Sequence, residues 1–300
     1  MFMGDHKPKQ VMQMLATSER AISKPKEELV FEYVDGPFGV VVHGIDWDNP
    51  KADEVALLTA ALRRHLVVCL RGQPSPTREQ RDQFFARFGT LMTGSFDGTF
   101  HYSLYSRDEK AEIHRNDDDA ENYIVSNEMG STELLWHTDH FHKPQLKTIS
   151  VLEAVEFEQG AVPTQFRDMY TACELVPLAL KTRLETKHGI YFDPRLPGPE
   201  KQPRLCDAMH PIFQPHPDSG RRSLYVHDYT RRIAGMPKEE SDGYLAELRA
   251  LIDAYAPVYA HAWQVGDLCF WDNIGLAHRR PGGGAGFNRK MRLYEGVAER

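Results

Sequence analysis

Two histidines and one aspartate have the types and the spacing of a mononuclear metal site. His137 and Asp139 stand two residues apart, and His278 follows a strand-like run that contains Trp271. In a β-strand, side chains two residues apart point to the same face, so His137 and Asp139 are predicted to reach one ion. Two imidazoles and one carboxylate form the ligand set typical of non-haem Fe(II) oxygenases, which leaves coordination positions open for reactants.

An arginine and a threonine elsewhere in the chain suit a dicarboxylate that would share this ion. Arg289 stands eleven residues after His278, and Thr164 offers a hydroxyl donor. A dicarboxylate such as 2-oxoglutarate chelates iron through its keto-acid end, and its other carboxylate needs a cation. The fixed donor fork of arginine fits that carboxylate. Arg292 is the alternative to Arg289 if the loop after His278 is bulged.

The composition argues against several other classes of protein. The formal net charge is −7 and the basic clusters are short, which disfavours nucleic acid as a partner. No apolar run approaches the ~20 residues of a membrane helix, and the N-terminus lacks the apolar core of a signal peptide. We therefore expect a soluble, cytoplasmic protein with a small-molecule substrate. The sequence leaves a homo-oligomer open.

The four cysteines are widely spread and form no C-x-x-C pair; they are Cys69, Cys173, Cys206 and Cys269. This pattern predicts reduced thiols rather than a disulfide framework. Cys69 and Cys269 lie in apolar strand-like runs, where a thiol is expected to behave as a small hydrophobe.

Hydrophobic periodicity predicts many short strands with a few flanking helices. Strands are expected at 29–34, 38–46 and 67–72, and helices at 52–66, at 78–89 after a Thr77 cap, near 169–185 and near 239–255. This mixture predicts a mainly β fold with a double-stranded β-helix core, a cupin-like jelly roll. A loose arm at 1–28 would precede one catalytic domain at 29–300, and the polar, aromatic-containing stretch 93–122 is expected to be a lid.

Over roughly residues 36–296, the chain resembles the taurine dioxygenase/2,4-D dioxygenase (TauD/TfdA) family of Fe(II)/2-oxoglutarate-dependent oxygenases. GVVVHGIDW resembles the opening strand of that family, and ALRRHLVVCLRGQ with FFARFG its next helix–strand–helix passage. The later motifs follow in the family's order: LLWHTDHFHKP, HPHPDSGRRSLYV, GDLCFWDNIGLAH and the arginine strand NRKMRLYEG.

The resemblance implies roles for the residues named above. His137, Asp139 and His278 would bind Fe(II), and Arg289 and Thr164 would bind 2-oxoglutarate, consumed with O₂ to give succinate and CO₂. A small organic substrate would be hydroxylated; desaturation or cyclisation is not separable by sequence. Halogenation is not expected, because enzymes of this type that halogenate generally lack the carboxylate that Asp139 supplies.

The chain departs from the family pattern at the substrate side. Members often carry a second arginine four residues after the first, which some use for an anionic substrate; Leu293 stands there. Ala161-Val162-Pro163 replaces the usual small GG before the threonine. The residues predicted to contact substrate are His101, Tyr102 and Tyr105 in the expected lid, His227 in YVHDYT, and Arg292.

Two other functions remain compatible with these residues, and several other histidines are not expected to bind the metal. A metal-binding cupin-like enzyme that does not use 2-oxoglutarate is the alternative, and a jelly-roll binding module without activity is a third reading. Five further histidines are interpreted as structural or exposed rather than as ligands: His140, His142, His210, His216 and His261. Asp272 and Asn273 are candidates for orienting the turn before His278.

Overall fold

The computed structural model describes residues 28–91, 113–115, 123–126, 133–197, 203–282 and 289–298. The expected N-terminal arm, nearly all of the expected lid, and the candidates His101, Tyr102 and Tyr105 lie outside the described residues.

Two large β-sheets carry the fold. The nine-stranded sheet has the order β1-β2-β3-β16-β8-β18-β6-β5, with β4 beside β18. Its strands are β1 Val30–Tyr33, β2 Val40–His43, β3 Val67–Leu70, β4 Thr90–Leu91, β5 Ile113–Arg115, β6 Tyr123–Ser126, β8 Ile149–Phe157, β16 Leu268–Asp272 and β18 Arg289–Ala298. The four-stranded sheet, β15-β9-β17-β7, comprises β15 Val258–His261, β9 Thr164–Asp168, β17 Leu276–Arg280 and β7 Leu134–His137. The mainly β architecture predicted from the sequence is confirmed.

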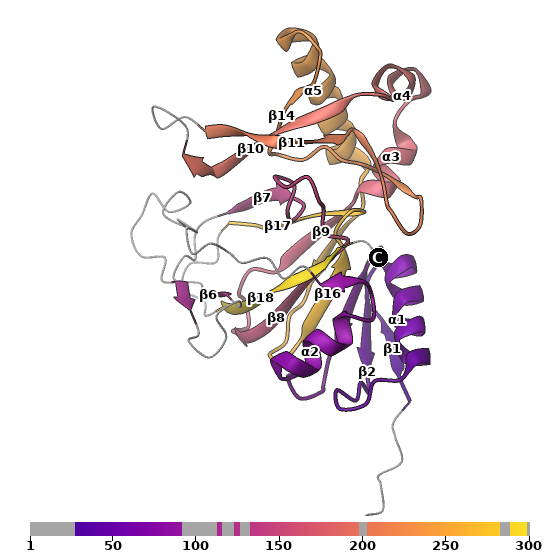
Figure 1. Ribbon diagram of the computed structural model, residues 1–300, viewed down its shortest axis with the longest axis vertical. Helices are drawn as coiled ribbons and strands as arrows, with labels where there is room; N and C mark the ends of the chain where they lie inside the picture. Colours follow the sequence, from indigo (N-terminus) through magenta and orange to yellow (C-terminus); the bar gives the residue numbers. More distant parts are fainter. Residues whose placement is uncertain are drawn as a thin grey trace, which may run out of the picture.

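Two helices cover one face of the nine-stranded sheet. Helix α1, Ala52–His65, buries apolar side chains at helical spacing, and α2, Arg78–Phe85, adds two phenylalanines. They pack on sheet residues such as Val68 and Phe270. Figure 1 shows α1 and α2 beside β1 and β2, at the end of the molecule away from α5. The central strands β3 and β16 are buried along their whole length, because both faces of the sheet are covered there.

The cap predicted for α2 is confirmed, but its predicted end is wrong. Thr77 accepts a hydrogen bond from the backbone N–H of Gln80, as an N-cap does. The helix ends at Phe85 rather than at Gly89, because tighter i→i+3 hydrogen bonds follow, one of them from Phe88 N to Phe85 O. This tighter turn lets Phe88 pack against the ring of Phe270, with centroids 5.6 Å apart.

The space between the two sheets is filled by a second set of buried side chains. One cluster joins Phe166 of β9, Trp271 of β16 and Leu276 of β17. A neighbouring cluster contains Cys69, Trp263, Cys269 and Met291. Trp271 is 1% exposed, so its indole lies fully within this core.

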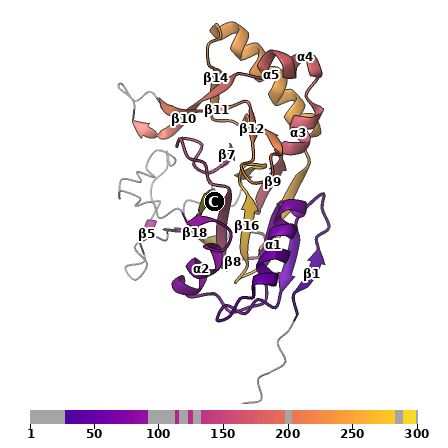
Figure 2. The same cartoon turned by 45° about the vertical axis from the view of Figure 1, so that its right-hand side comes forward.

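A third layer, formed by helices and short strands, covers the outer face of the four-stranded sheet. It contains α3 Met169–Leu175, α4 Leu178–Leu184, α5 Lys238–Tyr255, the sheet β11-β10-β14 (Pro203–Pro211, His188–Pro197 and Thr230–Ile233), and the pair β12 Phe213–Pro215 with β13 Arg222–Leu224. Figures 1 and 2 show α3, α4 and α5 gathered with β10, β11 and β14 at one end of the molecule. Trp136 of β7 packs into this layer.

The single helix predicted near 169–185 is two helices. Val176 has an extended backbone, φ −61° and ψ 127°, between α3 and α4. Pro177 follows it, and proline disfavours helical geometry in the preceding residue. Pro177 is visible in the sequence, so the break between the two helices could have been predicted from it. Among the described residues, no helix has both the length and the apolar character needed to cross a membrane.

Candidate active site

The two candidate histidine ligands lie opposite each other on paired strands. His137 is the last residue of β7, and its register partner on β17 is His278. Their ring centroids are 4.2 Å apart. Because side chains of directly opposed residues leave the sheet on one face, pairing alone brings these two imidazoles together.

Asp139 joins them from a turn, which corrects the geometry expected from the sequence. The strand ends at His137, so Asp139 is not placed by strand alternation. Its Oδ1 nevertheless lies 3.9 Å from His137 Nε2 and 3.6 Å from His278 Nε2. One ligand atom from each of the three residues falls within 4.8 Å of the others. The set predicted from the sequence is therefore brought together in space.

Asn273 holds the turn that carries Asp139. Its Oδ1 accepts a hydrogen bond from the backbone N–H of Asp139 at 2.9 Å, and its Nδ2 donates to the backbone oxygens of Asp139 at 3.0 Å and Lys147 at 3.1 Å. Asn273 is fully buried. One amide thus fixes the Asp139 turn against the turn between β16 and β17.

Asp272 orders the next part of that turn. Its Oδ1 accepts from the backbone N–H groups of Ile274 at 3.0 Å and Gly275 at 2.7 Å, and its Oδ2 accepts from the Tyr170 hydroxyl at 2.7 Å. A Cβ at Gly275 would meet the Tyr170 ring at 2.0 Å, so only glycine fits there. The path into β17 and His278 is therefore set by buried polar contacts.

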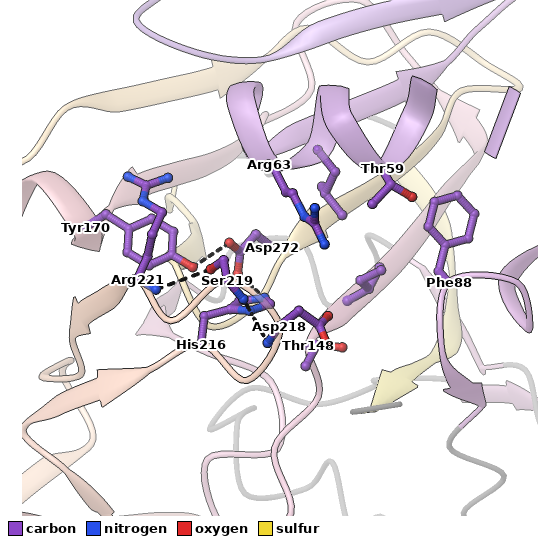
Figure 3. A pocket seen from close by; sticks show the side chains of 12 residues that line it. Thr59, Arg63, Phe88, Thr148, Tyr170, His216, Asp218, Ser219, Arg221 and Asp272 are labelled. Atoms are coloured by element: carbon purple, nitrogen blue, oxygen red, sulfur yellow. Dashed lines mark hydrogen bonds and ion pairs between the residues drawn. The ribbon is translucent and has the colours of Figure 1, made fainter. Parts of the chain in front are cut away.

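A pocket of about 50 Å³ opens beside Asp272. Figure 3 shows Tyr170 and His216 directed toward Asp272, and Arg63 reaching in from α1. His216 Nε2 is 3.8 Å from Asp272 Oδ1. None of the three candidate ligands belongs to its described lining. We therefore assign this pocket to the support of the turn rather than to the reaction centre.

The charges around the three candidate ligands suit a divalent cation. Burial would raise the pKa of the Asp139 carboxyl, but His278 and Lys147 outweigh it and hold this pKa well below its usual range. Burial, with His137 as the next cause, lowers the pKa of His278 to about 3. The carboxylate is thus ionised and His278 is neutral, as metal ligands must be.

The unpaired carboxylate oxygen of Asp139 points to the same conclusion. Asp139 Oδ2 is buried without a hydrogen-bond partner among the described residues. His137 Nδ1 lies 2.7 Å from the carbonyl oxygen of Leu135, which leaves its Nε2 to face Asp139. Such a backbone contact orients an imidazole for coordination through its other nitrogen. The donor set and its geometry fit a metal ion.

The dicarboxylate candidates Arg289 and Thr164 are in contact. Arg289 Nη2 donates to Thr164 Oγ1 at 3.1 Å, and Trp263 Nε1 donates to the same oxygen at 3.1 Å. Thr164 lies two residues from Phe166, the register partner of His278, so all three side chains leave the sheet on one face.

Arg289 has the environment of a preformed anion site. It is 5% exposed, and its Nε has no hydrogen-bond partner among the described residues. Burial, and then the charge of Arg280, lower the pKa of the Arg289 guanidinium to about 9. A carboxylate beside the guanidinium would raise this pKa again and so offset burial and the charge of Arg280. Arg292 is directed elsewhere, to Glu153 Oε2 at 2.8 Å.

His227, one of the two described members of the predicted substrate set, lies between β13 and β14 in an aromatic cluster. Its ring centroid is 5.0 Å from Phe141, 5.0 Å from Tyr191 and 6.0 Å from Tyr229. Tyr229 in turn lies 6.1 Å from the ring of His137. Burial, followed by the charge of His137, lowers the pKa of His227 well below its usual value. This neutral, largely apolar wall adjoins the candidate ligands.

The sequence interpretation missed the partners of His227. Tyr225 and Tyr229 stand two residues on either side of it, and Phe141 lies two residues after Asp139. These spacings were a usable signal for one cluster. Lys147 was missed as well; it is 3% exposed and its charge acts on Asp139 and His278.

The other histidines divide into two groups. His210 Nε2 lies 2.9 Å from the carbonyl oxygen of Phe141, in keeping with a structural role. His261 is buried and has an acidic neighbour, because its Nε2 is 3.2 Å from Asp267 Oδ2. His261 also gathers with Cys69 and Cys269. Only strand pairing brings these residues together, so sequence spacing gave no sign of the group.

Comparison with known proteins places this site in a family. Residues 31–294 match the model described as "Taurine catabolism dioxygenase TauD, TfdA family". Pentalenolactone F synthase of Streptomyces arenae is 30% identical over 278 residues, which cover 81% of this chain and 87% of that protein. The alpha-ketoglutarate-dependent 2,4-dichlorophenoxyacetate dioxygenase of Cupriavidus pinatubonensis is 28% identical over 240 residues, 75% of this chain and 82% of that protein.

A solved structure with the same fold is AAD-2 in complex with Mn(II) and N-oxalylglycine. It superposes with a TM-score of 0.67 at 23% identity, over 91% of this chain and 98% of that chain. This likeness confirms the jelly-roll core expected from the sequence. With the family match over most of its length, the chain belongs to the TauD, TfdA family and is a 2-oxoglutarate-dependent dioxygenase.

Proposed function

We propose that His137, Asp139 and His278 bind Fe(II), that Arg289 and Thr164 bind the distal carboxylate of 2-oxoglutarate, and that the enzyme hydroxylates a small organic substrate. The observation that carries the proposal is the convergence of the three ligand atoms within 4.8 Å, with Asp139 Oδ2 buried and without a hydrogen-bond partner among the described residues. A His₂-carboxylate set is the ligand set of non-haem Fe(II) oxygenases.

The neighbour AAD-2 supports both halves of this site. It is described with Mn(II), a divalent ion, and with N-oxalylglycine, a dicarboxylate whose oxalyl end can chelate a metal as 2-oxoglutarate does. The contact between Arg289 and Thr164 offers a cation and a hydroxyl for the other carboxylate. Bound Fe(II) would supply the activation of O₂ that is coupled to conversion of 2-oxoglutarate into succinate and CO₂.

The residues of the chain would position the reactants and shield them. His137 and Asp139 are fixed by their contacts with Leu135 and Asn273, and Arg289 would set the orientation of 2-oxoglutarate through its far end. The aromatic group around His227 would exclude water from the side next to His137.

The described surroundings favour an uncharged reacting end of the substrate. The wall beside His137 consists of aromatic rings and a neutral imidazole, and the Arg292 guanidinium is engaged by Glu153. Desaturation and ring closure would use the same groups, and product analysis separates them from hydroxylation. Free Cys69, Cys173 and Cys269 are in keeping with the cytoplasmic setting that we propose.

An anaerobic titration of Fe(II)-loaded protein with 2-oxoglutarate tests the proposal. We expect a weak, saturable visible charge-transfer band of the chelate that His137→Ala and Asp139→Ala abolish. Arg289→Gln should keep the iron and shift the titration to higher 2-oxoglutarate concentration. Iron bound in wild-type protein without any band would reject this assignment.

A further inference from the structure

A second group of metal-ligating side chains lies between the two sheets. Cys69 on β3, His261 on β15 and Cys269 on β16 are 1%, 1% and 0% exposed. Cys69 and Cys269 are direct register partners across the antiparallel β3–β16 pair. One ligand atom from each of the three residues lies within 4.8 Å of the others. No part of the His137, Asp139 and His278 site is shared with this group.

His261 lies close to one sulfur of the group and to a neighbouring carboxylate. His261 Nε2 is 3.3 Å from Cys269 Sγ and 3.2 Å from Asp267 Oδ2. With zinc–sulfur bonds of ~2.3 Å and zinc–nitrogen or zinc–oxygen bonds of ~2.0–2.1 Å, tetrahedral angles separate neighbouring ligand atoms by roughly 3.3–3.8 Å. The group therefore stands near the spacing that an ion requires.

We propose that Cys69, His261 and Cys269 supply three ligands of a buried structural site for a thiophilic tetrahedral ion, with Zn²⁺ as the best match. Two sulfurs and one imidazole select zinc-like ions over the hard ions that prefer oxygen. Because all three side chains are at most 1% exposed, the site would stabilise the packing of the sheets rather than bind substrate.

The charges of the group balance once an ion is present. Arg71 holds Asp267 through two hydrogen bonds, at 2.7 Å and 2.6 Å. A dication, two thiolates, the Asp267 carboxylate and the Arg71 guanidinium sum to zero. Binding would release two protons from the Cys69–His261–Cys269 group into solution, because its ligands must be deprotonated. A neutral set is the condition for burying charge at this depth.

The surroundings already fix the orientation of the His261 imidazole. His261 Nδ1 lies 2.8 Å from the Tyr259 hydroxyl, so Nε2 is the nitrogen that faces the sulfur. A hydrogen bond on the far nitrogen is the usual support of a metal-bound histidine.

The group also adjoins the proposed 2-oxoglutarate site. His261 is the register partner of Thr164, and its ring lies 4.5 Å from that of Trp263, whose Nε1 donates to Thr164 Oγ1. An ion held by His261 would thus help to place the threonine that Arg289 contacts.

Cobalt titration of the full-length, metal-stripped protein under reducing conditions tests the proposal. Thiolate ligands give Co²⁺ an intense near-ultraviolet charge-transfer band that imidazole and carboxylate ligands do not give. We expect two Co²⁺ per wild-type chain and this band. His278→Ala should lose one equivalent and keep the band, whereas Cys69→Ser/Cys269→Ser should lose the band and keep the other equivalent.

Cys173→Ser is the matched control, since Cys173 is buried but lies outside the group, and it should keep both ions and the band. If Cys69→Ser/Cys269→Ser does not fold, His278→Ala alone tests the proposal. One Co²⁺ with the band in that variant would support the site, and loss of the band would overturn it. One Co²⁺ per wild-type chain without the band, with four free thiols titrating after unfolding, would overturn the proposal. Two thiols missing until a reductant is added would also overturn it, in favour of a Cys69–Cys269 disulfide.

Discussion

Arg292 Nη1 donates to Glu153 Oε2 at 2.8 Å, across directly opposed positions of β18 and β8. Arg289 lies three residues earlier on β18 and donates instead to Thr164. Residues an odd number apart on a strand face opposite sides, so the two arginines serve different surroundings. Arg292 is held by the Glu153 carboxylate, whereas Arg289 is buried and its Nε has no hydrogen-bond partner among the described residues.

Arg289→Gln and Arg292→Gln should therefore affect different measurements. Loss of the Arg289 charge would remove the proposed charge-assisted hydrogen bond to 2-oxoglutarate, and we expect the apparent Kd of 2-oxoglutarate to rise by about 10- to 100-fold. Arg292→Gln should leave that Kd within about threefold and lower the free energy of unfolding. Titrations of the iron-loaded variants and chemical denaturation measure the two effects. Equal 2-oxoglutarate affinity in wild type and Arg289→Gln would contradict the assignment.

Asn273→Ala should weaken metal binding although Asn273 is not a ligand. The change removes three hydrogen bonds, two of them to the backbone of Asp139. We expect metal affinity to fall by about 10- to 100-fold, the usual effect of losing a group that orients a ligand. Asn273→Asp keeps the acceptor for the Asp139 N–H. Its metal affinity should therefore lie between those of the wild type and Asn273→Ala. Competition with a chelator gives the affinities, and unchanged affinity in Asn273→Ala would count against this role.

Gly275→Ala should disturb the turn before β17. The new Cβ would meet the Tyr170 ring at 2.0 Å, and Tyr170 is itself tied to Asp272. We expect a loss of about 1–3 kcal/mol of unfolding free energy, as for other overpacked cores. Gly243→Ala is the control, because it lies in α5 with open space around it and should stabilise the helix by about 0.5–1 kcal/mol. Denaturant unfolding checks both, and equal stability of the two variants would contradict the expectation.

The metal-free protein should lose stability as the pH falls below about 6.5. Burial lowers the pKa of both His227 and His210, so the unfolded chain binds protons there that the folded chain refuses. The free energy of unfolding then falls with falling pH, by at most about 1.4 kcal/mol per pH unit for each histidine. His227→Gln should flatten this dependence. The free energies of unfolding of the wild type and His227→Gln at about pH 7 and about pH 5.5 test this expectation. An equal change with pH in the two proteins would refute the role of His227.

Local signals in the sequence predicted the parts of the structure that depend on near neighbours. The Thr77 cap, the apolar face of α1 and the strands β1, β2 and β3 were visible from spacing. The break at Pro177 was visible too but was overlooked. The order of several motifs then identified the family, and with it the three candidate ligands.

Contacts made by strand pairing were beyond local signals. No residue near Cys69 in the sequence indicates that Cys269 lies directly opposite it, or that His261 of the other sheet lies close to both. The burial of Lys147 near Asp139 is equally a product of packing. Residues far apart in sequence meet only when the register of each sheet is known, and register depends on the whole hydrophobic pattern.

The pairing of His137 with His278 would tie the proposed metal ion to the population of folded chains. The two residues come from distant parts of the sequence and are neighbours only after β7 and β17 have paired. An ion that binds this arrangement and not the unfolded chain adds about 2.7 kcal/mol to the free energy of unfolding when its free concentration is a hundred times Kd. Withdrawal of the metal removes that increment, and chains that open are exposed to proteases. The amount of this protein in a cell would then follow the supply of its metal.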